Sequence, residues 1–156
     1  MDSIIVSGGQ RLNGTVSTSG SKNAALPILF ASLLADGRHH FDNVPELKDI
    51  ESTQQLLASL GATSERQGGS LLVDVEAPAA HVADYDMVRK MRAGILCLGP
   101  LLARYGEARV SLPGGCAIGS RPIDLHIETM RRLGADISSE GGYVVARAQR
   151  LVGDRI

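Results

Sequence analysis

Cys116 is the residue of this 156-residue chain whose setting best suits chemistry at a side chain. It follows Gly114 and Gly115, comes shortly before an expected helix, and has Arg121 five positions further along the chain. Glycine lets a backbone approach a ligand closely. A guanidinium and a helix N-terminus both favour the thiolate form of a nearby cysteine. Cys116 is therefore our candidate reactive thiol, with a tolerated loop cysteine as the alternative.

The second cysteine has a different setting. Cys97 sits in the apolar run Ile95-Leu96-Cys97-Leu98, where we expect a buried cysteine that acts as a small hydrophobic side chain. The histidines and cysteines show no spacing typical of metal ligands. The GxxxxGK[ST] loop of nucleotide-binding proteins and the GxGxxG dinucleotide motif are both missing. We expect no metal site.

Basic side chains stand at equivalent places in the two halves of the chain. Lys22, in Ser21-Lys22-Asn23, comes just before a helix start, where an ammonium and free helix N–H groups can hold an anion. In the second half, Arg92-Ala93 corresponds to Asn23-Ala24, so Arg92 puts a charge at the equivalent edge of its unit. Two polar residues flank the start of the last expected helix: Asp124 and His126. Each of these residues also has a simpler interpretation as an exposed polar side chain. Together, the thiol of Cys116 and the three cations Lys22, Arg92 and Arg121 nevertheless predict a site for a multiply charged anion. A carboxylate, phosphate or diphosphate would suit these groups.

Composition excludes several classes of partner. Sixteen basic and seventeen acidic residues give a net charge of −1, whereas a nucleic-acid-binding domain normally carries a basic excess. Aromatic residues make up only 3% of the chain, which leaves little for base stacking. No apolar run reaches the roughly 18 residues of a membrane helix, and the N-terminus lacks the basic start of a secretion signal. Two cysteines without such a signal indicate the reducing cytoplasm.

Hydrophobic periodicity and glycine positions predict an alternation of helices and strands. Expected helices cover residues 24–34, 47–60, 87–103 and 122–133. Expected strands cover residues 13–19, 38–44, 63–67, 70–75, 108–112, 136–139 and 143–147. Pro27 is expected in the first turn of its helix or at a kink. This is an α/β (α+β) pattern.

The pattern occurs twice. Leu60-Gly61-Ala62 recurs as Leu133-Gly134-Ala135, and Gly68-Gly69 recurs as Gly141-Gly142, both at an offset of 73. We infer two copies of one unit: helix, strand, helix, strand, strand. Gly37 and Leu60 are 23 positions apart, whereas their counterparts Gly106 and Leu133 are 27 apart. The second copy therefore carries extra residues, and they fall in the cysteine loop at 113–121.

These landmarks divide the chain into an N-terminal strand segment (1–21), a first repeat (22–77), a second repeat (78–148) and the start of a third (149–156). Arg11-Leu12-Asn13-Gly14 precedes the first copy, and Arg150-Leu151-Val152-Gly153 comes after the second. Repeat units bury their apolar faces against neighbours, usually with three or more copies. We therefore expect either a piece of a longer protein or a form that needs a partner to complete its core.

Three segments carry a resemblance to a known family: Thr18–Pro27 (TSGSKNAALP), Met91–Ala93 (MRA) and Ser111–His126 (SLPGGCAIGSRPIDLH). They are similar to the UDP-N-acetylglucosamine enolpyruvyl transferases of bacterial peptidoglycan synthesis. The resemblance implies two domains, each made of three α/β repeats, with the active site between them. This chain would hold two repeats of an incomplete domain. The implied reaction moves the enolpyruvyl group of phosphoenolpyruvate to the 3′-hydroxyl of UDP-N-acetylglucosamine, with no metal or organic cofactor.

The resemblance also implies roles for individual residues. Cys116 would be the proton donor to the enol methylene and the thiol that fosfomycin alkylates. Phosphoenolpyruvate would be bound by Lys22, Asn23 and Arg121. UDP-N-acetylglucosamine would be bound by Asn23, Arg92, Arg121, Pro122, Ile123, Asp124 and Leu125.

Family chains are longer than this one. The carboxylate base, a further arginine and the opposing domain would lie beyond Ile156, so we expect little or no turnover from these 156 residues alone. The rival hypothesis is a non-catalytic module of the same fold that binds an anion or a nucleotide sugar, with Cys116 as a redox thiol.

Overall fold

Two β-sheets form the outer layers of the fold. The computed structural model describes residues 3–76, 81–88, 91–112 and 123–155, without the Arg92 side chain. The first sheet has the order β1-β3-β2, and its strands are β1 (Gly37–Phe41), β2 (Ala62–Gln67) and β3 (Ser70–Val75). The second has the order β4-β5-β7-β6, with strands β4 (Val82–Ala83), β5 (Glu107–Ser111), β6 (Asp136–Glu140) and β7 (Tyr143–Arg147). All strand pairs are antiparallel except β4 with β5.

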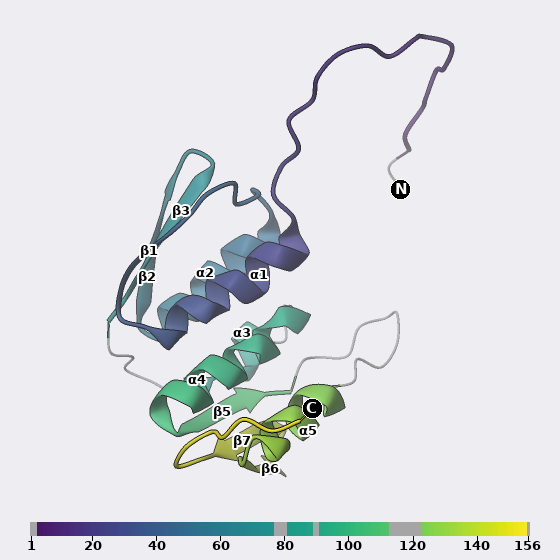
Figure 1. Cartoon of the computed structure of the whole chain (residues 1–156). Coiled ribbons are helices and arrows are strands. Elements are labelled where there is room, and N and C mark those ends of the chain that lie inside the picture. The colour runs from purple at the N-terminus through teal and green to yellow at the C-terminus, as the bar shows by residue number, and fades with distance from the viewer. Residues whose placement is uncertain (1–2, 77–80, 89–90, 113–122, 156) are drawn as a thin grey trace.

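Helices fill the space between the sheets (Figure 1). The first unit contributes α1 (Lys22–Ala31), η1 (Ser32–Leu34) and α2 (Lys48–Ser59). The second contributes α3 (Tyr85–Val88), η2 (Arg92–Cys97), α4 (Leu98–Tyr105) and α5 (Asp124–Arg132). Contacts join α1 to η2, η1 to α4 and α2 to α3, so the helices of the two units pack against each other.

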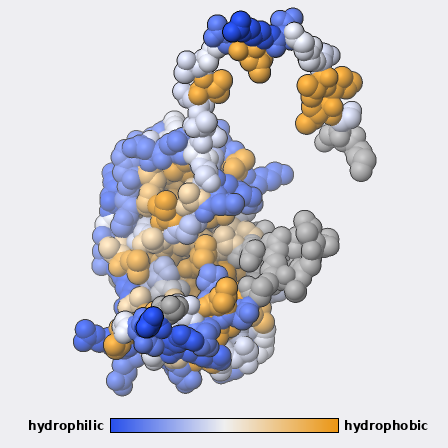
Figure 2. All heavy atoms as spheres, turned by 45° about the vertical axis from the view of Figure 1, so that its right-hand side comes forward, coloured by the Kyte–Doolittle hydropathy of each residue, from blue (hydrophilic) through white to orange (hydrophobic). Residues whose placement is uncertain are grey.

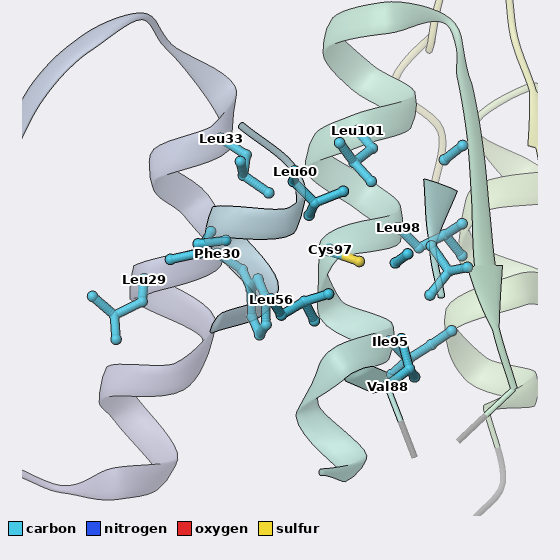
Figure 3. Close-up of a cluster of buried hydrophobic side chains, with 14 of the residues drawn as sticks. Leu29, Phe30, Leu33, Leu56, Leu60, Val88, Ile95, Cys97, Leu98 and Leu101 are labelled. Atoms are coloured by element: carbon cyan, nitrogen blue, oxygen red, sulfur yellow. The ribbon is translucent and has the colours of Figure 1, made fainter. Parts of the chain in front are cut away.

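The buried apolar side chains of the described residues form one hydrophobic core, which runs through this helical layer. Its buried residues include Phe30 from α1, Leu33 from η1, Leu56 from α2, Leu60 at the C-cap of α2, and Leu101 from α4 (Figure 3). Cys97 is fully buried among them, as its apolar setting in the sequence predicts. Burial raises the pKa of its thiol from 9.0 to about 12, so Cys97 is a packing residue at neutral pH.

Arg104 provides a polar link between the units. Its guanidinium donates a hydrogen bond to the Leu33 carbonyl at 3.0 Å and pairs with Asp36. It also lies 5.2 Å from the centre of the Tyr105 ring. A largely buried arginine with several partners holds two elements in a defined relation.

Most of the expected elements are confirmed. The helices expected at 24–34, 47–60 and 122–133 match α1 with η1, α2 and α5 within a few residues. The strands expected at 38–44, 63–67, 70–75, 108–112, 136–139 and 143–147 match β1, β2, β3, β5, β6 and β7. The α/β class and the two-fold recurrence of the unit are therefore confirmed, while the exact domain boundaries stay a prediction.

The strand expected at 13–19 is wrong. Residues 3–20 form no helix or strand, and the part before Gly20 extends away from the body as an arm (Figure 1). Its apolar side chains, Ile4, Ile5, Val6, Leu12 and Val16, are 83–94% exposed. The arm as a whole stands clear of the other elements (Figure 2). A strand needs a neighbour for its backbone hydrogen bonds, and no described segment lies beside this one.

The long helix expected at 87–103 is also wrong. The structure divides this region into α3, η2 and α4, and it places the short strand β4 before them, where the sequence pattern predicts none. Gly94 lies against the Val88 backbone and side chain, where an added Cβ would come within 3.0 Å of a Val88 methyl. Such close packing bends the chain back on itself, which a continuous helix does not allow. Pro27 lies inside α1, past its first turn, and the helix continues through it.

Candidate functional site

The start of α1 presents unsatisfied backbone donors beside a cation. Lys22 is the first residue of the helix, and Ser21 at the N-cap makes no side-chain capping bond. The first turn contains no acidic residue. The first amides of a helix have no acceptor inside it, and together they carry a partial positive charge. Lys22 and the Asn23 amide at this point give the start of α1 features that suit an anion. Anion binding there stays a prediction.

The start of α2 lies directly beside the start of α1. Lys22 Nζ is 2.7 Å from Asp49 Oδ2, and Asp49 belongs to the first turn of α2. The two side chains are 44% and 37% exposed, so the pair is open to solvent. Two helix N-termini therefore converge on the ammonium of Lys22.

A buried threonine connects this pair to the second unit. Thr53 is fully buried, and its hydroxyl donates to the Asp49 carbonyl at 2.8 Å. The same hydroxyl oxygen is 3.4 Å from Met91 Sδ. Met91 directly precedes Arg92, the first residue of η2. The starts of α1, α2 and η2 are thus tied together through Asp49, Thr53 and Met91.

Gly20 sets the point at which the chain enters α1. A Cβ at this position would lie 1.8 Å from the Asn43 carbonyl oxygen and 3.3 Å from the Pro45 ring. No side chain fits there unless the backbone moves. The tight contact between residues 20 and 43 therefore fixes Ser21 and Lys22 in place.

The second part of the expected site is only partly described. Cys116, Arg121 and Pro122 lie outside the described residues. Ile123 precedes α5, Asp124 begins it, and Leu125 comes next with 79% of its surface exposed. In Figure 1 the start of α5 lies at the same side of the molecule as the start of α1. The structure thus links Lys22 to Met91, the residue before Arg92, through Asp49 and Thr53. The convergence of Arg92, Cys116 and Arg121 on Lys22 and Asn23 stays a prediction.

The described pocket lies elsewhere. A cavity of about 610 Å³ is lined by residues at the start of β1, the start of β2 and the end of β3, including Asp36, Arg38 and Asp74. This is the opposite end of β1 from Asn43 and Gly20, so the cavity is not part of the expected site. Among the described residues, no group of three histidine, cysteine or acidic side chains is placed to hold a metal ion. The described residues also contain no helix that meets the length and hydropathy needed to span a bilayer.

Three residues of the site were not predicted from the sequence. Asp49, Thr53 and Gly20 have ordinary sequence signals: an acidic first turn, a helical threonine and a glycine before a helix. Their roles come from the packing of α2 beside α1 and η2, which no local pattern reveals. The Gly20 contact with residue 43 is likewise a tertiary feature.

Comparison with known proteins identifies the class. The chain matches the EPSP synthase (3-phosphoshikimate 1-carboxyvinyltransferase) family over residues 6–155. Its fold is similar to that of the enolpyruvyl transferase NikO from Streptomyces tendae, with a TM-score of 0.75 and 26% identity over 92% of this chain and 32% of that one. EPSP synthase from Acinetobacter baumannii shares the fold with a TM-score of 0.64 at 21% identity, over 90% of this chain and 33% of that one. The chain belongs to the EPSP synthase family of enolpyruvyl transferases.

Sequence relatives are more specific. The chain is 59% identical over 150 residues to a UDP-N-acetylglucosamine 1-carboxyvinyltransferase of Bdellovibrio bacteriovorus, covering 96% of this chain and 36% of the relative. It is 58% identical over 156 residues to the protein of the same name from Desulfosudis oleivorans, covering 100% of this chain and 37% of the relative. The resemblance predicted from the three motif segments is thereby confirmed. The chain spans a little over a third of the length of these curated relatives.

Proposed function

We propose that this chain is the N-terminal part of an enzyme that transfers the enolpyruvyl group of phosphoenolpyruvate to the 3′-hydroxyl of UDP-N-acetylglucosamine and releases phosphate. The observation that carries the proposal is the 59% identity over 150 residues to a UDP-N-acetylglucosamine 1-carboxyvinyltransferase. The proposal places the enzyme in the cytoplasm, at the first committed step of peptidoglycan synthesis.

Lys22 and Asn23 would bind phosphoenolpyruvate at the start of α1. The substrate carries a phosphate and a carboxylate, and both suit an ammonium beside free helix amides. The lack of an acidic residue in the first turn of α1 supports this role. Arg121 would add a guanidinium to the same anion, since a planar fork matches phosphate and carboxylate oxygens.

UDP-N-acetylglucosamine would lie against the second unit. Arg92 at the start of η2 would help hold its charge, and the segment from Arg121 to Leu125 would line its site. Asn23 would contact the sugar as well as phosphoenolpyruvate. The ties from Lys22 through Asp49 and Thr53 to Met91 support a shared site, because they hold the starts of α1 and η2 together.

Cys116 would supply the proton that starts the transfer. Its thiol proton would move to the methylene carbon of phosphoenolpyruvate, while the sugar 3′-hydroxyl adds to the neighbouring carbon and loses its own proton to a base. Loss of a proton from the new methyl group, with departure of phosphate, would restore the double bond in the product. Positive charge develops at the attacked carbon in the first step. The phosphate and carboxylate of phosphoenolpyruvate, held close to that carbon, would stabilise this charge.

The remaining part of the longer protein would supply the base, a further arginine and the opposing wall of the site. We therefore expect little or no turnover from residues 1–156 alone, because an open site does not exclude water. The exposed arm and the exposed Leu125 on α5 are apolar surfaces that such a part would cover.

A fusion protein tests the proposal. Residues 1–156 are joined in frame to the part of the Bdellovibrio relative that this chain does not match, and phosphate release is measured with both substrates. We expect release that requires both phosphoenolpyruvate and UDP-N-acetylglucosamine. A folded fusion that binds the UDP-sugar but releases no phosphate would reject the transferase and support the non-catalytic binding module. A Cys116→Ala fusion is the matched control for background hydrolysis.

A further inference from the structure

Lys22 occupies an electrostatically unfavourable position. A lysine at the first residue of a helix is repelled by the partial positive charge of the N-terminus. The first turn of α1 has no acidic side chain to offset this repulsion. The counter-charge comes instead from the neighbouring helix, where Asp49 Oδ2 lies 2.7 Å from Lys22 Nζ.

Asp49 is itself well held. As an acidic residue in the first turn of α2, it lies where the helix dipole favours negative charge. The fully buried Thr53 donates to its carbonyl at 2.8 Å and packs against Met91 of the second unit. The carboxylate therefore projects from a fixed point of the fold and not from a loop.

The ion pair contributes little to stability. Solvent screens exposed pairs of this kind, and both side chains here are more than a third exposed. The pair does fix the location of a flexible ammonium. Misplacing a catalytic contact by about 1 Å costs on the order of 100-fold in rate, so placement matters more here than pairing energy.

We propose that Asp49 is a positioning residue for Lys22: its carboxylate holds the ammonium between the starts of α1 and α2, ready for the phosphoenolpyruvate anion. This inference rests on the proposed function. Asp49 acts through Lys22 and need not touch substrate. The negative charge of Asp49 would by itself repel an anion. If that charge effect dominates, removing the carboxylate should strengthen phosphoenolpyruvate binding; if positioning dominates, removing it should slow turnover.

Steady-state kinetics of the fusion protein separate the two effects. Asp49→Asn is expected to lower kcat about 10- to 100-fold and to change the KM for phosphoenolpyruvate by less than about threefold, with partial recovery in Asp49→Glu. The matched control is Asp74→Asn, which removes a pair with Arg38 of 2.8 Å whose carboxylate is also 37% exposed. A lower KM with unchanged kcat in Asp49→Asn would overturn the inference, as would an equal loss in Asp74→Asn.

NMR of the 156-residue chain provides a readout that needs no turnover. The ε-methylene and Nζ resonances of Lys22 are expected to shift in Asp49→Asn and to stay unchanged in Asp74→Asn. Absence of that shift would reject the ion pair and the inference with it. If the shift is present but the unsubstituted fusion lacks turnover, the proposed function fails, and Asp49 is only a structural contact.

Discussion

The two units share an order of elements but differ in the segment that connects the middle strand to the second helix. In the first unit β1 leads through residues 42–47 into α2, which buries Ile50, Leu56 and Leu57 completely. In the second unit β5 leads through the longer segment 112–123 into α5, which has no fully buried residue. In the first unit, therefore, a short connection leads into a helix that packs in the core. In the second unit the connecting segment is longer, although the first unit forms the same order of elements without the extra length. Such additional loop length is typical of segments that carry function.

The largest expected effect concerns the cysteine loop. Cys116→Ala in the fusion protein should reduce phosphate release by about 100-fold or more, because general acid catalysis contributes about 10²–10⁴. Cys97→Ala, in the core, should leave the rate per folded molecule nearly unchanged. Turnover measurements on protein quantified by a folding probe check this. Equal losses in both variants would remove the functional distinction between the two cysteines.

The difference between α2 and α5 predicts a large contrast in stability. Ile50→Ala should lower the free energy of unfolding by about 2–5 kcal/mol, because it opens a cavity in the core. Leu125→Ala should change it by less than about 0.5 kcal/mol, since 79% of that residue is exposed. Urea denaturation of the 156-residue chain measures the free energy of unfolding of both variants and of the parent. Similar losses would show that α5 is packed as firmly as α2.

Gly20→Ala should have a smaller effect on stability and a clear effect on binding. The new methyl group would meet the Asn43 carbonyl, and the resulting backbone shift should cost about 1–3 kcal/mol. The start of α1 would move with it. Calorimetric titration with phosphoenolpyruvate should then show weaker binding to the fusion protein. The control is Gly69→Ala, where the added Cβ meets nothing within 4 Å. Unchanged affinity in Gly20→Ala would contradict the role given to this contact.

The smallest effect is the change in stability between pH 8 and pH 10. Burial raises the pKa of Cys97 to about 12 from 9.0, so the folded state keeps its proton between pH 9 and pH 12 while the unfolded state loses it. Stability should therefore fall as the pH rises through this range, by up to about 1.4 kcal/mol per pH unit. Urea titrations of the parent chain and Cys97→Ala at pH 8 and pH 10 measure the difference. The same pH slope in both proteins would contradict this assignment.

Local patterns explain how much of the fold was predictable. The amphipathic spacing of residues 47–60 and the glycine turn at 68–69 predict α2 and the β2–β3 hairpin, because each depends on neighbours in sequence. The errors at 13–19 and 87–103 have a different origin. Pairing of a strand and bending of a helical segment depend on what lies beside them in space, which periodicity does not contain.

The site was predictable to a similar extent. Lys22 is marked in the sequence by its place before a helix, and Arg92 by its equivalent place in the second copy. The structure ties the starts of α1 and η2 together. Asp49 and Thr53 carry no such mark, because their importance arises where α2 packs against α1 and η2. Residue types and spacing indicate which groups do chemistry, whereas tertiary contacts decide which groups position them.

The central claim is that Cys116 shares one site with Lys22 and Arg92. Mass spectrometry of the fusion protein after fosfomycin treatment, with and without UDP-N-acetylglucosamine, tests it most directly. We predict a single adduct on Cys116, formed faster when the UDP-sugar is bound, with Cys97 unmodified. Equal modification of both cysteines, at a rate that the UDP-sugar does not change, would contradict the shared site.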